Sequence, residues 1–311
     1  MVDSLLMDEK TRHTLEYDRI LEQLAAHCDF PVSAEKARAL RPMNKLHHVR
    51  HALAETSEAR QLLEEKPELS IGGTRDIREA LKAAIRHDVP QTSQFLDIKY
   101  TLIAARNLRR IFERQGDQYP YLAEISLRLP LSTGLVDDIS QTLSDRGEVL
   151  DSASPTLASI RREMKISHDR LLSQLERMVQ SSDTSRYLQD AIITQRDGRY
   201  VLPVRADDRK HIDGIVHDQS ASGATVYIEP ASIVKKNNQY RQLQLDERDE
   251  VRRVLSALTA KVGEHAEVLF EMIDALADLD LTLARAKYAE ALRAAEPTLH
   301  PIRVSKDGER V

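Results

Sequence analysis

The segment 190–230, DAIITQRDGRYVLPVRADDRKHIDGIVHDQSASGATVYIEP, decides the fold, because it combines β-branched runs with turn signals while its flanks have helical patterns. Asp197-Gly198 separates two apolar runs. Asp-Gly favours a type I′ hairpin turn because both central residues need a positive φ. A second hairpin is expected from 214–218 and 224–229, closed by 219–223. The segment is therefore predicted to form a small antiparallel sheet.

Heptad patterns flank this sheet on both sides. Before it, apolar residues repeat every seven positions, at Leu157, Met164, Leu171 and Met178. After it, two rows alternate, one at Leu255, Val262, Leu269, Leu276 and Leu283 and the other at Val251, Leu258, His265, Met272 and Leu279. This spacing is typical of a coiled-coil seam. We expect helix 155–181 to pair antiparallel with one returning helix, 232–294, which would be about 90 Å long and bent at Gly263.

The residues before the two paired helices, about 14–145, have the shorter apolar stripes of a helical bundle. Ser33 is the expected N-cap of helix 33–40, which ends before Pro42. The predicted fold is thus mainly α, a helical bundle with a long antiparallel coiled-coil arm that carries the sheet. The last residues, 302–311, read as a strand, an Asp-Gly turn and a second strand cut short, so we expect a fragment of a longer protein.

Composition and charge exclude several classes of protein. The 311 residues carry a net charge of −5, and aromatic residues make up 4% with no Trp, so the chain is not a globally basic nucleic-acid binder. A local basic patch would still be sufficient for such binding. Cys28 is the single cysteine, which excludes a disulfide framework and fits a reducing compartment. No apolar run has the length of a membrane span, and we expect a cytoplasmic protein.

Basic residues gather near the turns of the predicted sheet and at the start of the returning helix. These candidate nucleic-acid-binding residues are Arg196, Arg199, Arg205, Arg209 and Lys210, followed by Lys235 and Lys236. They would contact phosphates without reading the base sequence, and binding would weaken with salt. The alternative is a solvated mixed-charge surface, because aspartates lie among them. Ser220 and Ser222 are candidates for the same role, or belong to a hairpin loop in which Gly223 supplies a positive φ.

A hydrolase-like set of side chains occurs in the second hairpin. His217, Asp218 and Ser220 are the residue types of a catalytic triad. A triad needs its members to converge from separate elements, and here neither an oxyanion site nor a nucleophile elbow accompanies them. A structural role is therefore expected for all three.

A possible metal site and the lone thiol have ordinary explanations. His47, His51 and Glu55 share one helix face, but His48 stands where a zinc peptidase motif has Glu, so surface histidines are expected. Cys28 is expected to be a buried structural thiol. The sequence contains no Gly-x4-Gly-Lys-Ser/Thr phosphate loop.

Several strings of the sequence resemble the MutS-two (MutS2) family of bacterial MutS-like proteins. They lie in the sheet at 197–204, 214–225 and 228–230, and outside it at 15–21, 72–78, 147–155, 237–238 and 279–281. The most specific string is His217-Asp218-Gln219-Ser220-Ala221-Ser222-Gly223. The resemblance covers essentially residues 14–300.

The resemblance implies a MutS core, or lever, interrupted by a clamp, without a mismatch-reading N-terminal domain. The expected segments are a helical core bundle at 14–150, an outgoing lever helix at 151–190, the β-rich clamp at 191–232, a returning lever helix at 233–296 and a truncated ATPase domain from 297 to 311. ATP, Mg²⁺ and a nuclease domain are then expected only in the longer parent protein, as a homodimer. This chain itself is expected to hold no cofactor or metal and to catalyse no reaction.

Two functions remain open. The first is a nucleic-acid-binding lever and clamp that closes on branched DNA or structured RNA, in recombination suppression or on stalled and collided ribosomes. The second is a coiled-coil arm that binds a ribosomal or other protein, which the acidic net charge and few aromatic residues favour. A steep fall of affinity with salt would distinguish the first from the second. For the chain alone we expect a monomer or a weak dimer.

Overall fold

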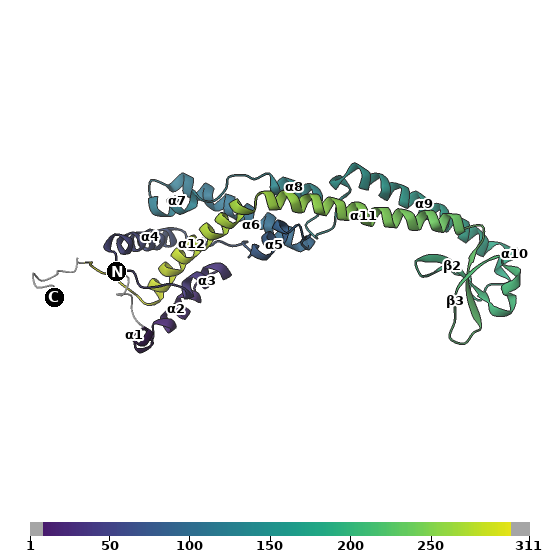
Figure 1. Cartoon of the computed structure of the whole chain (residues 1–311), viewed down its shortest axis with the longest axis horizontal. Helices are drawn as coiled ribbons and strands as arrows, with labels where there is room; N and C mark the ends of the chain where they lie inside the picture. Colours follow the sequence, from purple (N-terminus) through teal and green to yellow (C-terminus); the bar gives the residue numbers. More distant parts are fainter. Residues whose placement is uncertain (1–8, 300–311) are drawn as a thin grey trace, which may run out of the picture. The chain divides into compact units, whose positions relative to one another are not determined.

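Helices form most of the described chain, and a four-stranded antiparallel sheet interrupts them, as the sequence predicts (Figure 1). The computed structural model describes residues 9–299, so the hairpin predicted at 302–311 lies outside the described residues. The chain divides into two compact units. Unit 1 contains the described residues up to Glu148 and those from Leu258 onward, and unit 2 is Val149–Ala257.

Unit 1 is a bundle of helices around a central helix, α12. Its helices are α1 (Glu9–Thr14), α2 (Tyr17–Ala25), α3 (Pro31–Arg38), α4 (Leu46–Glu65), α5 (Arg78–Ile85), α6 (Thr92–Gln115), α7 (Pro120–Ser126), α8 (Leu135–Thr142) and α12 (Ala266–Ala291). α12 packs against α2, α3, α4, α5 and α7, and Figure 1 shows it in yellow-green among them. Its buried residues lie on all sides of the helix, which is typical of a central helix.

The returning helix is two helices, which corrects the expectation of a single long one. α11 (Val234–Glu264) ends one residue before His265, whose φ of −100° and ψ of 5° are not helical, and α12 follows. The joint is next to Gly263, where an added Cβ would lie 3.1 Å from the carbonyl oxygen of Ala84 in α5. The seven-residue repeat of α12 therefore serves contacts with several bundle helices and not the seam of a two-stranded coiled coil.

Buried carboxylates bind the N-termini of two helices in unit 1. Such ends carry N–H groups without partners inside the helix. Asp280 on α12 accepts a hydrogen bond from the Phe30 N–H, at 3.0 Å, where α3 begins. Ser33 donates to the same carboxylate from inside α3, so it is not the N-cap that the sequence predicts. Glu58 on α4 binds the start of α7 in the same way, accepting from the Leu122 N–H at 3.0 Å.

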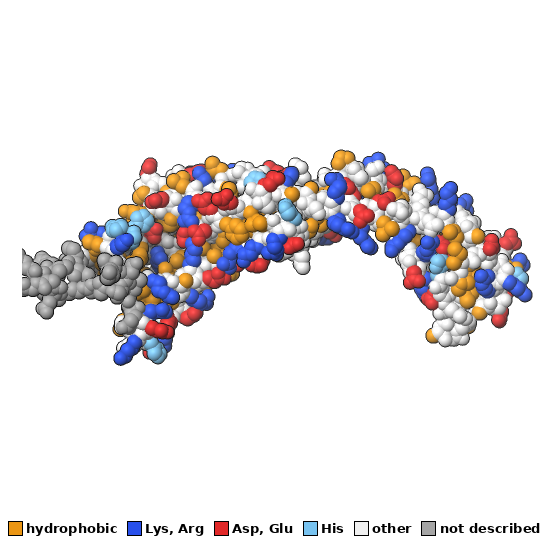
Figure 2. Space-filling view, in the orientation of Figure 1, with side chains coloured by type: hydrophobic (Ala, Val, Ile, Leu, Met, Phe, Trp, Pro, Cys, Tyr) orange, Lys and Arg blue, Asp and Glu red, His pale blue; other side chains and the backbone are white. Residues whose placement is uncertain are grey.

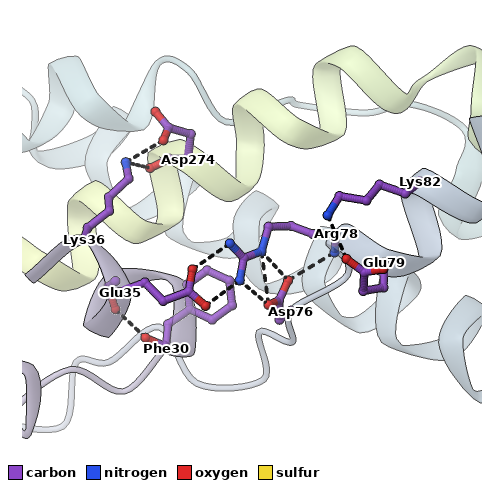
Figure 3. Close-up of polar contacts among 9 residues, drawn as sticks. Phe30, Glu35, Lys36, Asp76, Arg78, Glu79, Lys82 and Asp274 are labelled. Carbon is purple, nitrogen blue, oxygen red and sulfur yellow. Dashed lines mark hydrogen bonds and ion pairs between the residues drawn. The ribbon is translucent and has the colours of Figure 1, made fainter. Parts of the chain in front are cut away.

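An ion-pair network joins α3 to the start of α5 (Figure 3). Arg78 donates to both carboxylate oxygens of Glu35, at 2.7 and 2.8 Å, and to Asp76 at 2.6 and 2.9 Å. These bonds lower the pKa of Glu35 and of Asp76. Lys36 of α3 pairs with Asp274 of α12 in the same view. Because these groups reach solvent, their contribution to stability is modest.

Unit 2 is an antiparallel helix pair that ends in the sheet. It contains η2 (Asp151–Ala153), α9 (Pro155–Gln180), α10 (Ser182–Ser185), β1 (Thr194–Arg196), β2 (Arg199–Arg205), η3 (Ala206–His211), β3 (Gly214–Gln219), β4 (Thr225–Pro230) and the first part of α11. The contacts between α9 and α11 run in opposite chain directions: Arg161 with Glu247, His168 with Tyr240, and Gln174 with Lys236. The predicted antiparallel pairing is therefore confirmed in this unit, as Figure 1 shows.

The sheet has the strand order β1-β2-β4-β3, and the two predicted hairpins are its outer pairs. Asp197 and Gly198 have φ values of 49° and 75°, as a type I′ turn requires. One face of the sheet packs on α9. Residues of this shared core are Leu171, Leu175, Leu202, Val204 and Ile228. The sheet is thus held to the helix pair by a hydrophobic core of its own.

Candidate nucleic-acid interface

A buried carboxylate, Glu229, connects the elements of the sheet on the face opposite to that core. Its side chain is 0% exposed. Arg199 donates to it at 2.9 Å, His217 Nε2 lies 2.6 Å away, and the Asn237 side-chain amide donates at 2.8 Å. A carboxylate without access to water needs such partners to remain in the fold. Glu229 therefore ties β2, β3, β4 and α11 together at one point.

Asn237 and its neighbour fasten the start of α11 to β2. The Asn237 amide accepts from the Tyr200 N–H at 3.1 Å and donates to the Tyr200 carbonyl oxygen at 2.9 Å. Asn238 accepts from Arg199 at 2.7 Å. Residues from four of the strings that carry the family resemblance thus meet around one carboxylate. The sheet is fixed rigidly relative to the start of α11.

Three of the predicted phosphate-binding arginines are paired with carboxylates. The pairs are Arg199–Glu229 at 2.9 Å, Arg196–Asp218 at 2.8 Å and Arg205–Asp208 at 2.9 Å. Arg196 also lies over the Tyr227 ring, 3.8 Å from its centroid. Because the Glu229 carboxylate is buried, a phosphate cannot replace it as the partner of Arg199. We therefore assign Arg199 to holding the sheet in position and not to phosphate contact. The carboxylate partners of Arg196 and Arg205 reach solvent, where a phosphate can compete with them.

Other predicted cations are exposed without such partners. Arg209 and Lys210 project from η3, which packs on β2 and β4, and Lys235 lies in the first turn of α11. Within residues 9–299 none of these three makes an ion pair or a side-chain hydrogen bond. Lys236 differs, because it donates to Gln174 of α9. Phosphate contact by these residues stays a prediction, and the geometry favours Arg209, Lys210 and Lys235 for it.

The β3–β4 loop uses its polar groups internally. Ser220 donates its N–H to the Thr225 carbonyl oxygen at 2.9 Å, and the Thr225 N–H donates to Ser220 Oγ at 3.0 Å. Gly223 has a φ of 74°, as the hairpin interpretation expects. Ser222 Oγ lies 3.4 Å from Ser220 Oγ at the exposed end of the loop. A phosphate contact by either hydroxyl stays a prediction.

The hydrolase-like side chains of this hairpin do not converge on a reaction centre. His217 contacts Glu229, Asp218 pairs with Arg196, and Ser220 closes the loop. Each side chain therefore has a structural partner of its own, and no base within residues 9–299 contacts the serine hydroxyl. This arrangement agrees with the structural role expected from the sequence.

The histidine-rich stretch of α4 lies at a pocket of about 370 Å³ in unit 1. His51 contacts Glu55 at 3.2 Å, and Arg285 lies 3.6 Å from the same carboxylate. Burial raises the pKa of Glu55. In the described part of the chain, no three His, Cys, Asp or Glu side chains are grouped so as to bind a metal ion. Cys28 is half-buried, and burial raises the pKa of its thiol.

Sequence reasoning missed Glu229 and Asn237, which hold the site together. One signal was present: Glu229 is a charged residue at the end of the apolar strand Thr225–Pro230. This signal does not identify the partners of Glu229, because the contacts join residues from separate elements.

The fold and the site define a class of protein. It is mainly helical, and an antiparallel helix pair carries a small antiparallel sheet that is locked by a buried polar network and displays basic side chains. Every described helix is too short or too polar to span a lipid bilayer. No family model matches the chain.

The chain is similar to curated proteins named Endonuclease MutS2. It is 44% identical to that of Thermomicrobium roseum over 288 residues, which is 92% of this chain and 36% of the relative. It is 40% identical to that of Pelotomaculum thermopropionicum over 293 residues, 94% of this chain and 37% of the relative. For the protein of Geobacillus sp. strain WCH70 the identity is 38% over 297 residues, with 94% and 38% covered. The chain belongs to the MutS2 family, and it spans little more than a third of the length of these relatives.

Proposed function

We propose that this chain is the nucleic-acid-binding lever and clamp region of a MutS2-type ATPase. In this proposal the sheet is the clamp, and the α9–α11 pair is the lever that carries it. The clamp contacts the phosphate backbone of branched DNA or of structured RNA, including that of stalled or collided ribosomes. The relatives are named endonucleases, which supports a nucleic-acid substrate for the longer parent protein.

One observation carries this proposal. Arg209 and Lys210 are exposed on η3 and, within residues 9–299, have no carboxylate partner, while the sheet beneath them is locked by Glu229. Cations held on a rigid element bind phosphates with little loss of conformational freedom. Backbone contacts of this kind do not depend on base sequence, which suits a substrate recognised by its shape.

The mechanism that we propose for the parent is mechanical. ATP and Mg²⁺ belong to its ATPase domain, and two protomers together enclose the nucleic acid. This chain contributes a stiff helix pair, and the Glu229 network makes the sheet move with the start of α11 as one body. Binding by this chain requires no catalytic group of its own.

Fluorescence anisotropy with linear duplex DNA, four-way-junction DNA and structured RNA tests the proposal. The variant Arg209→Glu/Lys210→Glu is expected to bind at least about tenfold more weakly, with a shallower dependence on salt between about 50 and 200 mM. The matched control is Arg162→Glu/Lys165→Glu, which reverses two exposed cations on α9. Equal affinities for the Arg209→Glu/Lys210→Glu variant and the wild type would contradict the proposal.

A specific observation favours the second candidate, a protein-binding arm. β3 is an edge strand, and its Ile215 and Val216 are 49% and 40% exposed. An edge strand with apolar side chains can pair with an added strand of a protein partner. Binding to ribosomal protein that changes little with salt and is lost in Val216→Lys, with no binding to nucleic acid, would favour this function.

A further inference from the structure

One face of α11 points away from α9 and carries arginines. At 3.6 residues per turn, positions 240, 243, 247 and 250 share the side that faces α9 and its N-cap, as the contacts of Tyr240, Glu247 and Glu250 show. The opposite side holds Arg241, Leu245, Arg248 and Arg252, all exposed. We call the three arginines the α11 ridge. Figure 2 shows blue side chains below α11, on the side of the pair away from α9.

Among the described residues, the carboxylates of α11 pair with one of the three ridge arginines and leave the other two without an ion pair. Glu247 pairs with Arg161 of α9, and Glu250 is bound by Arg253 and by the Ser154 hydroxyl. These two carboxylates therefore use their charge on the inner side of the helix or on its flank. One carboxylate, Asp249, contacts the ridge, through an exposed pair with Arg252 at 3.1 Å. The ridge keeps a positive charge.

The spacing of the ridge is unfavourable for the helix itself. Arg248 and Arg252 are four residues apart, and like charges at that spacing repel each other. Arg248 makes no ion pair or side-chain hydrogen bond within the described residues. Arg241 has one weak neutral hydrogen bond, to Gln244 at 3.4 Å. An anionic ligand would relieve this repulsion.

The outer face of α9 gives a contrast within the same unit. It also carries exposed cations, Arg162, Lys165 and Arg170, but exposed Glu163 and Asp169 alternate with them. Charges of both signs along a helix face are typical of a solvated surface. The two helices of the pair therefore differ, and only the face of α11 segregates positive charge.

The ridge continues into the β1–β2 hairpin. A Cβ added to Gly198 would lie 3.4 Å from Arg241 Nη1, so the guanidinium rests against the turn. Asn238, one helical turn before Arg241, is held by Arg199 of β2. The hairpin thereby fixes the first arginine of the ridge relative to the sheet.

We propose that the α11 ridge binds the phosphodiester backbone of a nucleic-acid duplex. The inference rests on the proposed function and extends the contact surface from the sheet along the helix. Arg241 and Arg248 are about 10 Å apart along the axis, and Arg248 and Arg252 about 6 Å. These separations correspond to about three and about two phosphates of one strand, at about 3.4 Å of axial rise per charge. Guanidinium groups suit such contacts because they bind phosphate oxygens in pairs.

The test measures anisotropy of the 311-residue chain with labelled 20-base-pair DNA and RNA duplexes, at several salt concentrations. The variant Arg241→Ala/Arg248→Ala/Arg252→Ala is expected to bind at least about tenfold more weakly at about 0.1 M salt, and to lower the salt slope by about two to three. The matched control, Arg162→Ala/Lys165→Ala/Arg170→Ala, removes the same charge from α9 and is expected to bind like the wild type. Arg→Lys changes at the three ridge positions are expected to retain most of the affinity. Thermal melts followed by circular dichroism check that each variant is folded.

The outcomes separate this inference from the proposed function. If the ridge variant binds like the wild type while Arg209→Glu/Lys210→Glu binds more weakly, the ridge does not contact the nucleic acid. The proposed contact by the sheet is then retained. The reverse pattern supports the ridge and overturns the contact at the sheet end. An equal loss in the α9 control shows that net charge alone matters and overturns the ridge. If the wild type binds neither duplex, both proposals are overturned. If it binds, the duplex with the higher affinity identifies DNA or RNA as the source of the backbone.

Discussion

Glu229 is the residue on which the arrangement of the sheet depends. Its carboxylate has three polar neighbours and no exposure, so removing it leaves Arg199 and His217 without their anion. Breaking one side of a buried ion pair costs more than the pair contributes, because the remaining charge is poorly solvated. The partners here are partly exposed, which reduces that cost.

We expect Glu229→Ala to lower the free energy of unfolding of unit 2 by about 2–4 kcal/mol. Urea unfolding followed by circular dichroism measures the change. Glu176→Ala, at an exposed position of α9, is the control and should stay within about 0.5 kcal/mol of the wild type. An unchanged midpoint for Glu229→Ala would mean that the network does not stabilise the sheet.

Glu250 gives unit 2 a dependence on pH. The Arg253 guanidinium and the Ser154 hydroxyl lower the pKa of this carboxyl from 4.5 to about 2. A depressed pKa in the folded state stabilises the protein above the unfolded value, and the stabilisation is lost as the pH falls from about 4.5 towards 2. Because Arg253 is exposed, we expect a loss of about 1–2 kcal/mol over this range.

The variant Glu250→Gln isolates that contribution. It is expected to be less stable than the wild type at pH 7 and to show a smaller loss between about pH 4.5 and pH 2. Denaturant unfolding at a series of pH values measures both. Parallel pH profiles for the two proteins would exclude Glu250 as the titrating group.

At the scale of elements, the joint between α11 and α12 depends on a close approach of two backbones. An added Cβ at Gly263 would lie 3.1 Å from the carbonyl oxygen of Ala84, so a side chain there requires the backbone of α5 to shift by a few tenths of an ångström. We expect Gly263→Leu to destabilise unit 1 by about 1–3 kcal/mol through overpacking. Ala260→Leu, at an exposed position of the same helix, is the control. Thermal unfolding compares the two, and equal melting temperatures would rule out the close contact.

The two long helices also show how far periodicity can be interpreted. In α9 the heptad pattern correctly predicts buried Leu157 and Leu171, and an antiparallel partner. The same period in α12 corresponds to a helix surrounded by others, since Leu276 and Leu279 are buried together with residues on the remaining sides, such as Ala277. Periodicity gives the spacing of buried residues, while the number of neighbouring helices depends on the tertiary structure.

For the whole molecule, local charge matters more than the sum. Unit 2 contains 17 Lys and Arg against 16 Asp and Glu, a net charge of +1, so the negative charge lies in the rest of the chain. Within unit 2, Arg209, Lys210, Arg241 and Arg248 are exposed and have no carboxylate partner among the described residues. A protein of this composition can therefore bind a polyanion through one surface while its total charge is negative. Both proposals, the clamp and the ridge, depend on this uneven distribution within unit 2.

The sequence by itself determined the mainly helical class, the two hairpins and the antiparallel α9–α11 pair. These follow from short-range rules: turn residues such as Asp197-Gly198 require particular backbone angles, and apolar spacing follows the period of each element. Only the tertiary structure decided that Asp280 caps α3, that Glu229 joins β2, β3, β4 and α11, and that Arg199 is paired while Arg209 is exposed. Those contacts join side chains that are distant in the sequence and are buried together only in the folded protein. No local sequence pattern specifies such long-range contacts.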